Sequence, residues 1–324
     1  MKNVKLKLAV LGAFSVLSAQ AFATGFVALP TAGVAVVAGA NQPAGTTGWE
    51  LCNTTGNYGS GTYTAPTIGA NNICAVFPGG GRDLTTSPVS TIATAVAAAT
   101  LTSITANGET LGTLGQRTWR NAANTQCVFA KYIDFATTGT FDYNPDLAGS
   151  QRFEANDVAL GGFSTTPTVS AGYYHTTTTD SPVFRVGRSF TSVQMQADLA
   201  NPLTTPATGF VHRPINGPTV PAAGTEINGV GQTLSPGTIV PTAAQQTSAI
   251  RTNWVDFTLD NTGGLDEDGT TSQNTPVMYV QANCTGSVAT TANTVRIRQT
   301  GQETQPCVTI LASGQTRVGA NANF

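Results

Sequence analysis

The sequence predicts an all-β fold, an antiparallel β-sandwich or jelly roll with long loops rich in Thr, Gly and Pro. Two observations predict it. Apolar and polar residues alternate between residues 254 and 311, and short β-prone segments separated by turn signals recur through the rest of the chain. Successive side chains of a strand point to opposite faces, so a period of two is typical of half-buried strands. Several short strands at such spacing favour a sandwich or jelly roll.

The C-terminal region gives the clearest strand pattern. Val295 and Ile297 share one face of an expected strand, while Arg296 and Arg298 share the other. We therefore expect an antiparallel sheet with one face in water. Val255, Phe257 and Leu259 likewise share a face. The four strands expected here cover residues 254–259, 277–280, 294–299 and 307–311.

Further strands are expected in the first two thirds of the chain. The strongest are 114–119 and 127–135, and the Asn- and Ala-rich segment 121–125 suits a turn between them. The β-branched content of 92–104 favours strand over helix. The shorter candidates are 49–52, 73–77, 169–174, 183–186 and 189–195.

Residues 1–23 have the three parts of a secretory signal peptide. Lys2, Lys5 and Lys7 precede an apolar run at 8–17, and small residues follow up to Ala23. The apolar run is too short to span a bilayer, and no later stretch is long and apolar enough to do so. We expect a mature chain that starts near Thr24 and is secreted, either to the extracellular space or to the cell surface.

The mature chain is poor in charge. Charged residues make up 10% of the sequence, and without the three leader lysines 12 basic and 17 acidic residues remain, a net charge of −5. Such a chain is a poor partner for nucleic acid or anionic membranes, which require clustered Lys and Arg. Low charge also removes a barrier to association between like molecules. The one remaining lysine, Lys131, is either an ordinary solvated side chain or a partner in a self-formed amide bond with Asn or Asp.

The predicted organisation is one β-sandwich with an N-terminal extension. Residues 24–38 form an apolar strand or arm, 39–200 the main part, 201–248 a Pro-, Gly- and Thr-rich excursion or linker, and 249–324 the C-terminal strands of the same domain. The extension is either the first strand of the sandwich or an arm that adds a strand to a neighbouring subunit. The apolar residues of this candidate arm are Phe26, Val27, Leu29, Val34, Val36 and Val37.

Five cysteines in an exported chain predict disulfides. Proximity in sequence favours Cys52–Cys74 and Cys284–Cys307. Cys127 is then left over, and it is either buried in its apolar strand, which we favour, or a link between subunits. No CxxC pattern supports a structural metal site.

A Gly-rich loop offers the best candidate metal site. Asp260, Asp266 and Asp268 provide hard oxygen ligands that suit Ca²⁺, although the spacing does not fit an EF-hand. The alternative is a polar hairpin loop. No other cofactor is predicted.

The sequence contains no motif of a hydrolase, neither GxSxG nor HExxH, and His175 and His212 are isolated candidates for a general base. The leading hypothesis is a non-enzymatic structural protein that self-assembles at the cell surface as a filament, matrix or coat subunit. The second is a secreted binding module, with Tyr173, Tyr174 and the tryptophans lining a carbohydrate site. An exported hydrolase is third.

Overall fold

A computed structural model gives the structure of the chain. It describes residues 25–36, 45–47, 49–52, 74, 81–106, 108–137, 153–166, 168–175, 180, 183, 185–188, 191–192, 213–214, 252–263, 273–299 and 308–320. The predicted signal peptide, almost all of the 201–248 excursion and most of the expected strand at 73–77 lie outside these residues. No helix in the described part is long and apolar enough to cross a membrane.

Two antiparallel sheets contain most of the strands. The first sheet has the order β1-β10-β15-β8-β7-β5, and β6 also pairs with β7. Its strands are β1 (Val27–Pro30), β5 (Thr94–Ala95), β6 (Thr100–Ala106), β7 (Glu109–Arg120), β8 (Gln126–Phe135), β10 (Thr168–Tyr174) and β15 (Val277–Asn283).

The second sheet has the order β17-β16-β9-β14-β11-β4. Its strands are β4 (Trp49–Leu51), β9 (Phe153–Gly161), β11 (Arg185–Gly187), β14 (Trp254–Gly263), β16 (Val288–Gln299) and β17 (Val308–Arg317). Two small ribbons complete the described strands, β2 (Val34–Val36) with β3 (Gly45–Thr47) and β12 (Thr191–Ser192) with β13 (Arg213–Pro214).

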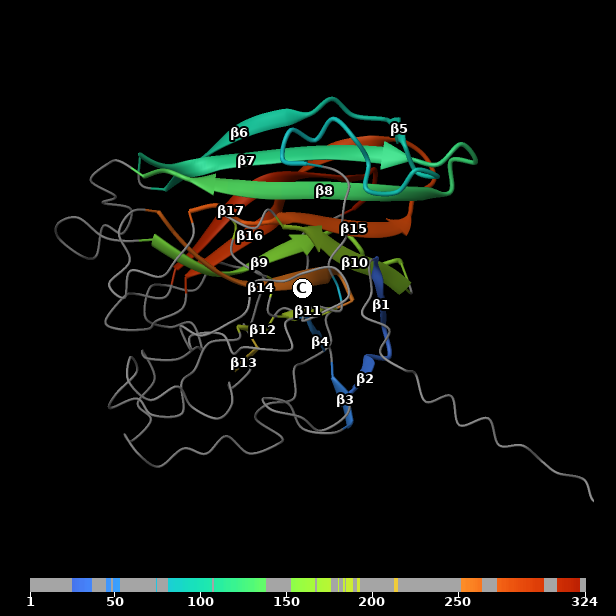
Figure 1. Ribbon diagram of the computed structural model, residues 1–324, viewed down its shortest axis with the longest axis horizontal. Helices are drawn as coiled ribbons and strands as arrows, with labels where there is room; N and C mark the ends of the chain where they lie inside the picture. Colours follow the sequence, from blue (N-terminus) through green and yellow to red (C-terminus); the bar gives the residue numbers. More distant parts are fainter. Residues whose placement is uncertain are drawn as a thin grey trace, which may run out of the picture.

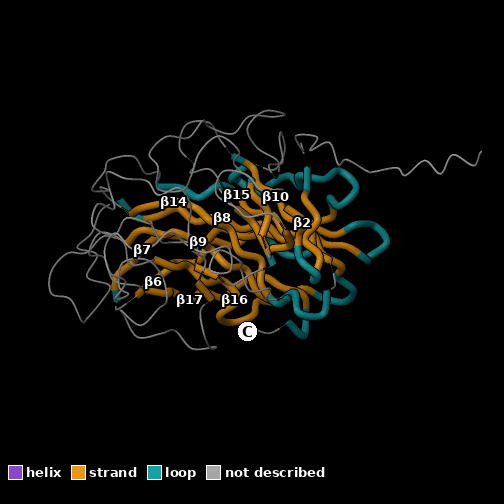
Figure 2. The backbone as a smooth tube through the Cα atoms, turned by 90° about the horizontal axis from the view of Figure 1, so that it is seen from below, coloured by secondary structure: helices purple, strands orange, loops and turns teal. Residues whose placement is uncertain are grey.

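The two sheets pack face to face as a β-sandwich, which confirms the predicted fold class (Figures 1 and 2). β17 contacts β6 and β7, and β14 contacts β8. The facing sides share one hydrophobic core that includes Phe129, Phe257 and Ile297. In both sheets, strands that are distant in sequence are neighbours. β15 lies between β10 and β8, and β14 lies between β9 and β11.

The four C-terminal strands and their faces are confirmed, but the expected wet face is not. Val295 and Ile297 point into the core, and Arg296 and Arg298 point to the opposite face. Both arginines are nevertheless buried, at 2% and 0% exposure. The prediction of a hydrated face was wrong at these positions, because an acidic pair and an aromatic ring receive the two guanidinium groups.

The outer face of the first sheet carries a second, smaller apolar cluster. Trp119, Tyr132 and Tyr279 lie on this face, and Leu84 and Ile92 from the segment 81–98 pack over them. The central strand β8 is consequently buried on both faces over most of its length.

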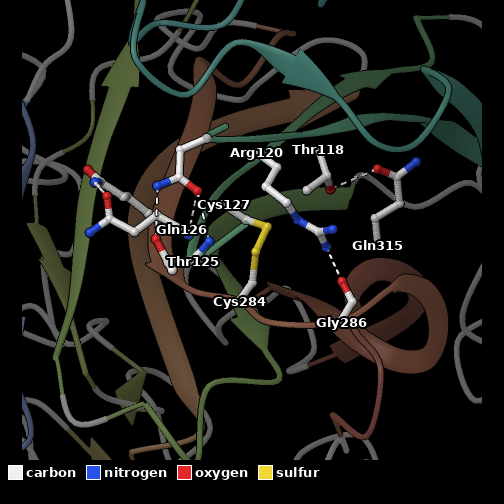
Figure 3. The surroundings of a disulfide bond; sticks show 10 residues. Thr118, Arg120, Thr125, Gln126, Cys127, Cys284, Gly286 and Gln315 are labelled. Carbon is white, nitrogen blue, oxygen red and sulfur yellow. Dashed lines mark hydrogen bonds between the residues drawn. A yellow bond between two sulfur atoms is a disulfide. The ribbon is translucent and has the colours of Figure 1, made fainter. Parts of the chain in front are cut away.

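Two disulfides cross-link the sandwich, one as predicted and one differently. Cys52 bonds to Cys74, while Cys284 bonds to Cys127 rather than to Cys307 (Figure 3). Proximity in sequence misled here, because Cys127 at the start of β8 lies beside the end of β15, with Cα atoms 5.6 Å apart. Cys307 lies outside the described residues.

Candidate functional site

The N-terminal strand β1 forms one edge of the first sheet. Its four residues pair antiparallel with β10, from Val27 opposite Ala171 to Pro30 opposite Thr168. Leu29 is fully buried in the inter-sheet core and Val27 packs against that core, while Ala28 between them is exposed. Val27 and Leu29, two residues apart, thus hold the strand against the core by their side chains. Peptides that bind by strand addition are held in the same way.

The residues on either side of β1 differ in how they are held. Phe26 contacts the outer aromatic cluster, with its ring centroid 6.4 Å from that of Tyr279. After β1 the chain turns at Gly33, whose positive φ of 91° and bond from its N–H to the Pro30 carbonyl close a tight turn. Val34 and Val36 continue into β2, and Val37 lies outside the described residues.

A charged cluster occupies the centre of the second sheet, on the face away from the core. The Arg298 guanidinium bonds to Asp157 through Nε and to Asp256 through Nη2, the latter at 3.1 Å. These residues come from the three strands β16, β9 and β14, and Arg298 lies opposite Asp157 in the ladder. All three side chains are buried.

The electrostatics of this cluster favour the protonated form of its acids. Burial raises the pKa of Asp157 to about 6, against the opposing effect of Arg298. Burial also raises the pKa of Asp256 well above its ordinary value, and the neighbouring Asp157 adds to that shift. One guanidinium balances one carboxylate, so a protonated Asp256 leaves the buried cluster neutral. With side chains 0–5% exposed, the cluster links three strands of the sheet and offers no surface to a substrate.

Lys131 lies in the core-facing row of β8, so the expectation of a solvated lysine was wrong. It is 2% exposed, and its Nζ donates to the Gln315 carbonyl at 3.0 Å. Gln315 also accepts a bond from Thr118 Oγ1, and its N–H donates to Gln116 Oε1 at 2.7 Å. These bonds join β7 and β8 to β17 by a polar seam. The ion pairs of the described residues include none to Lys131, and burial lowers its pKa to about 7.

A second charged cluster pins the segment 81–98 to the end of β8. Arg82 forms ion pairs with Asp134 and with Asp180, the latter at 3.2 Å, and its guanidinium lies 4.4 Å from the centre of the Tyr132 ring. His175 lies near Asp180 at 5% exposure. Burial lowers the pKa of His175, and Asp180 opposes that shift. This histidine is therefore enclosed rather than presented to a substrate, while His212 is outside the described residues.

The side chains of the predicted calcium ligands lie outside the described part of the chain. Asp260 lies in β14 without a described side chain, and Asp266 and Asp268 lie outside the described residues. Within the described ranges, no group of three or more His, Cys, Asp or Glu residues is arranged to hold a metal ion.

The aromatic residues considered for a sugar site belong largely to the two cores. Tyr173 and Trp254 are fully buried, and Trp119 is 1% exposed. Tyr174 is half-buried beside the outer cluster. These four rings therefore contribute to packing, and the side chain of Trp49, the third tryptophan, lies outside the described part.

Sequence reasoning missed the charged cluster of the second sheet. The alternation that placed Arg296 and Arg298 on one face also placed Asp256 on the matching face of its strand, and that signal was available. The partner strand β9 was not predicted, so the second acid, Asp157, had no place in the sheet.

Comparison of the chain with protein-family models, with curated proteins and with solved structures finds no match.

Proposed function

We propose that this protein is an exported, non-enzymatic structural subunit that assembles with copies of itself at the cell surface, as a filament, matrix or coat. In this proposal β1 is the exchanged strand. In an isolated chain it completes its own sheet, and in the assembly the same segment would pair with β10 of the next subunit. Exchange of an identical element is a low-cost route to self-association, because the contacts are the same in both states.

The observation that carries the proposal is the attachment of β1. Among the described strands it pairs with β10 alone, and Leu29 is its one fully buried side chain. It precedes every other described strand, and a turn at residues 31–33 separates it from β2. A short edge strand with one fully buried side chain pairs with its neighbour in a defined register. Its release from the sheet requires only a limited free energy, because few contacts are lost.

The composition gives a second line of support. A mature net charge of −5 spread over about 300 residues provides little repulsion between subunits. A chain with 10% charged residues also has few of the lysines and glutamates that normally protect sheet edges from pairing.

Deletion of residues 24–37 tests the proposal. The expected result is loss of assemblies in negative-stain electron microscopy, with a folded or chaperone-dependent monomer remaining. The variant Leu29→Asp removes the anchor alone, and Ala28→Asp is its matched control, because Ala28 lies on the exposed side of the same strand. Assembly that survives both the deletion and Leu29→Asp would contradict strand exchange. Dispersed monomers of the wild-type protein that a polysaccharide column retains would favour a binding module instead.

A further inference from the structure

At the opposite edge of the first sheet, the described residues include no strand or charged side chain that would protect β6 against pairing. β6 hydrogen-bonds to β7 on one side, and no described strand pairs with its other side. Its sequence, TLTSITA, contains no charge and no proline. Edge strands usually carry a lysine, a proline or a covering element, because an open row of N–H and C=O groups is a template for another strand.

Leu101 is the most exposed large apolar side chain of the described residues. It is 71% exposed, and its cross-strand neighbour on β7 is Gly115, which offers no side chain to cover it. A larger residue could not replace that glycine without displacing Tyr132, because a Cβ at position 115 would lie 2.2 Å from the Tyr132 ring. Because Tyr132 of the outer cluster requires a glycine at position 115, the Leu101 side chain remains exposed beside the edge of the sheet.

We infer that β6 is an interface for a second copy of this chain, which adds its own β6 antiparallel to form a sheet continuous across two subunits. The occupant follows from the geometry, because two identical strands that pair antiparallel are related by a two-fold axis and present the same groups to each other. Leu101, Ser103 and Thr105 alternate on the outer face with no charge among them, so the two strands meet without repulsion and bury both Leu101 side chains.

This interface extends the proposed assembly and lies at the edge opposite β1. Exchange of β1 produces a directional contact from subunit to subunit, whereas pairing through β6 joins two subunits symmetrically. The biological meaning of the β6 contact rests on the proposed function. The contact itself does not require β1 to be exchanged, so the two are tested separately.

Cysteine cross-linking and sedimentation of the full mature chain test the inference. Around a two-fold axis one residue faces itself, so mild oxidation should cross-link Leu101→Cys or Ser103→Cys into dimers, or the two variants with each other when they are mixed, depending on the register. Val318→Cys is the control, because Val318 is 59% exposed and lies beyond the end of β17, outside the β6 strand. Cross-linking of either β6 variant or of the mixture well above this control supports the inference, and none of the three exceeding it overturns it.

A charged residue introduced at the β6 edge provides a second test. Leu101→Lys places two like charges across the interface and removes the buried leucines, so it should raise the dimer dissociation constant by about tenfold or more. Val318→Lys should not change it. The same Leu101→Lys variant should retain the exchange of β1. Absence of β6 cross-linking in the cysteine variants while assembly is intact would refute the inference alone, whereas β6 dimers without higher assembly would refute the proposed function alone.

Discussion

Lys131 and Asp256 show how burial shifts the pKa values of single residues in opposite directions. Both are buried, and burial disfavours the charged form of each. The pKa of Lys131 falls to about 7 and that of Asp256 rises. Compared with the unfolded chain, the folded protein therefore binds fewer protons at Lys131 and more at Asp256. The two residues contribute opposite slopes to the free energy of unfolding as a function of pH.

Replacement of Lys131 by Met tests the first slope. In the wild-type protein the free energy of unfolding should rise between pH 7 and 10.5, because the unfolded lysine keeps its proton over that range and the folded one has lost it. Each pKa unit corresponds to about 1.4 kcal/mol. Lys131→Met should remove this rise and unfold at higher urea concentration than wild type at pH 6. An unchanged pH slope in the variant would contradict the buried, uncompensated lysine.

The acidic pair makes the opposite prediction at lower pH. The folded-state pKa values of Asp157 and Asp256 lie above the unfolded value, so the wild-type free energy of unfolding should fall as pH rises from about 4 through 6 and beyond. Asp256→Asn imitates the protonated acid, so we expect it to flatten this fall and to be more stable than wild type at pH 8. Urea titrations at pH 4, 6 and 8 measure both.

Loss of the central cation should have a larger effect. Arg298→Met leaves two buried acids without their guanidinium, and breaking a buried pair in this way costs about 3–5 kcal/mol. Arg317→Met is a suitable control, because Arg317 is half-buried and takes no part in the ion pairs of Arg298 with Asp157 and Asp256. Equal stability of the two variants at pH 7 would show that the cluster does not hold the sheet.

At the scale of the element, clean alternation was predictable and irregular strands were not. The core faces of β14 and β16 follow directly from Val255, Phe257, Val295 and Ile297. The strand β9 was not predicted because its core-facing residues do not keep a period of two. They are Phe153 and Ala155 at first, and then Val158 and Leu160, and the change occurs where the register with β14 shifts. A bulge of this kind interrupts the period of two that identifies a strand.

The segments 183–186 and 189–195 are represented by β11 and β12, and residues 184, 189–190 and 193–195 lie outside the described residues. The edge positions of β1 and β6 could not be predicted, because strand order is a property of the whole sheet and not of any one segment.

The Cys127–Cys284 disulfide gives a prediction for a pair of elements. It closes a loop of 157 residues between β8 and the end of β15. Beside it, the Arg120 guanidinium donates a hydrogen bond to the Gly286 carbonyl (Figure 3). The double variant Cys127→Ser, Cys284→Ser should lose about 2–5 kcal/mol of stability. Cys307→Ser is the control and should keep the wild-type melting temperature. A Cys284–Cys307 peptide in a non-reducing digest would contradict the pairing.

At the scale of the whole molecule, several of the few charged side chains are buried in polar clusters, such as Arg298 with its two acids. The edges of the first sheet carry no charge in the described strands, because they are formed by β6 and by the short strands β1 and β5. This distribution of charge is what the proposed assembly through the first sheet requires.

Strand exchange at β1 is the central claim, and one cross-linking measurement tests it most directly. Ala28 lies opposite Ser170 across β1 and β10. Chains carrying only Ala28→Cys are mixed with chains carrying only Ser170→Cys under assembly conditions, oxidised mildly and separated on a non-reducing gel. Exchange predicts a disulfide-linked dimer that contains one chain of each kind, with neither variant cross-linking when it assembles alone. Assemblies that form without this mixed dimer, while the double variant cross-links within a single chain, would show that β1 stays on its own subunit.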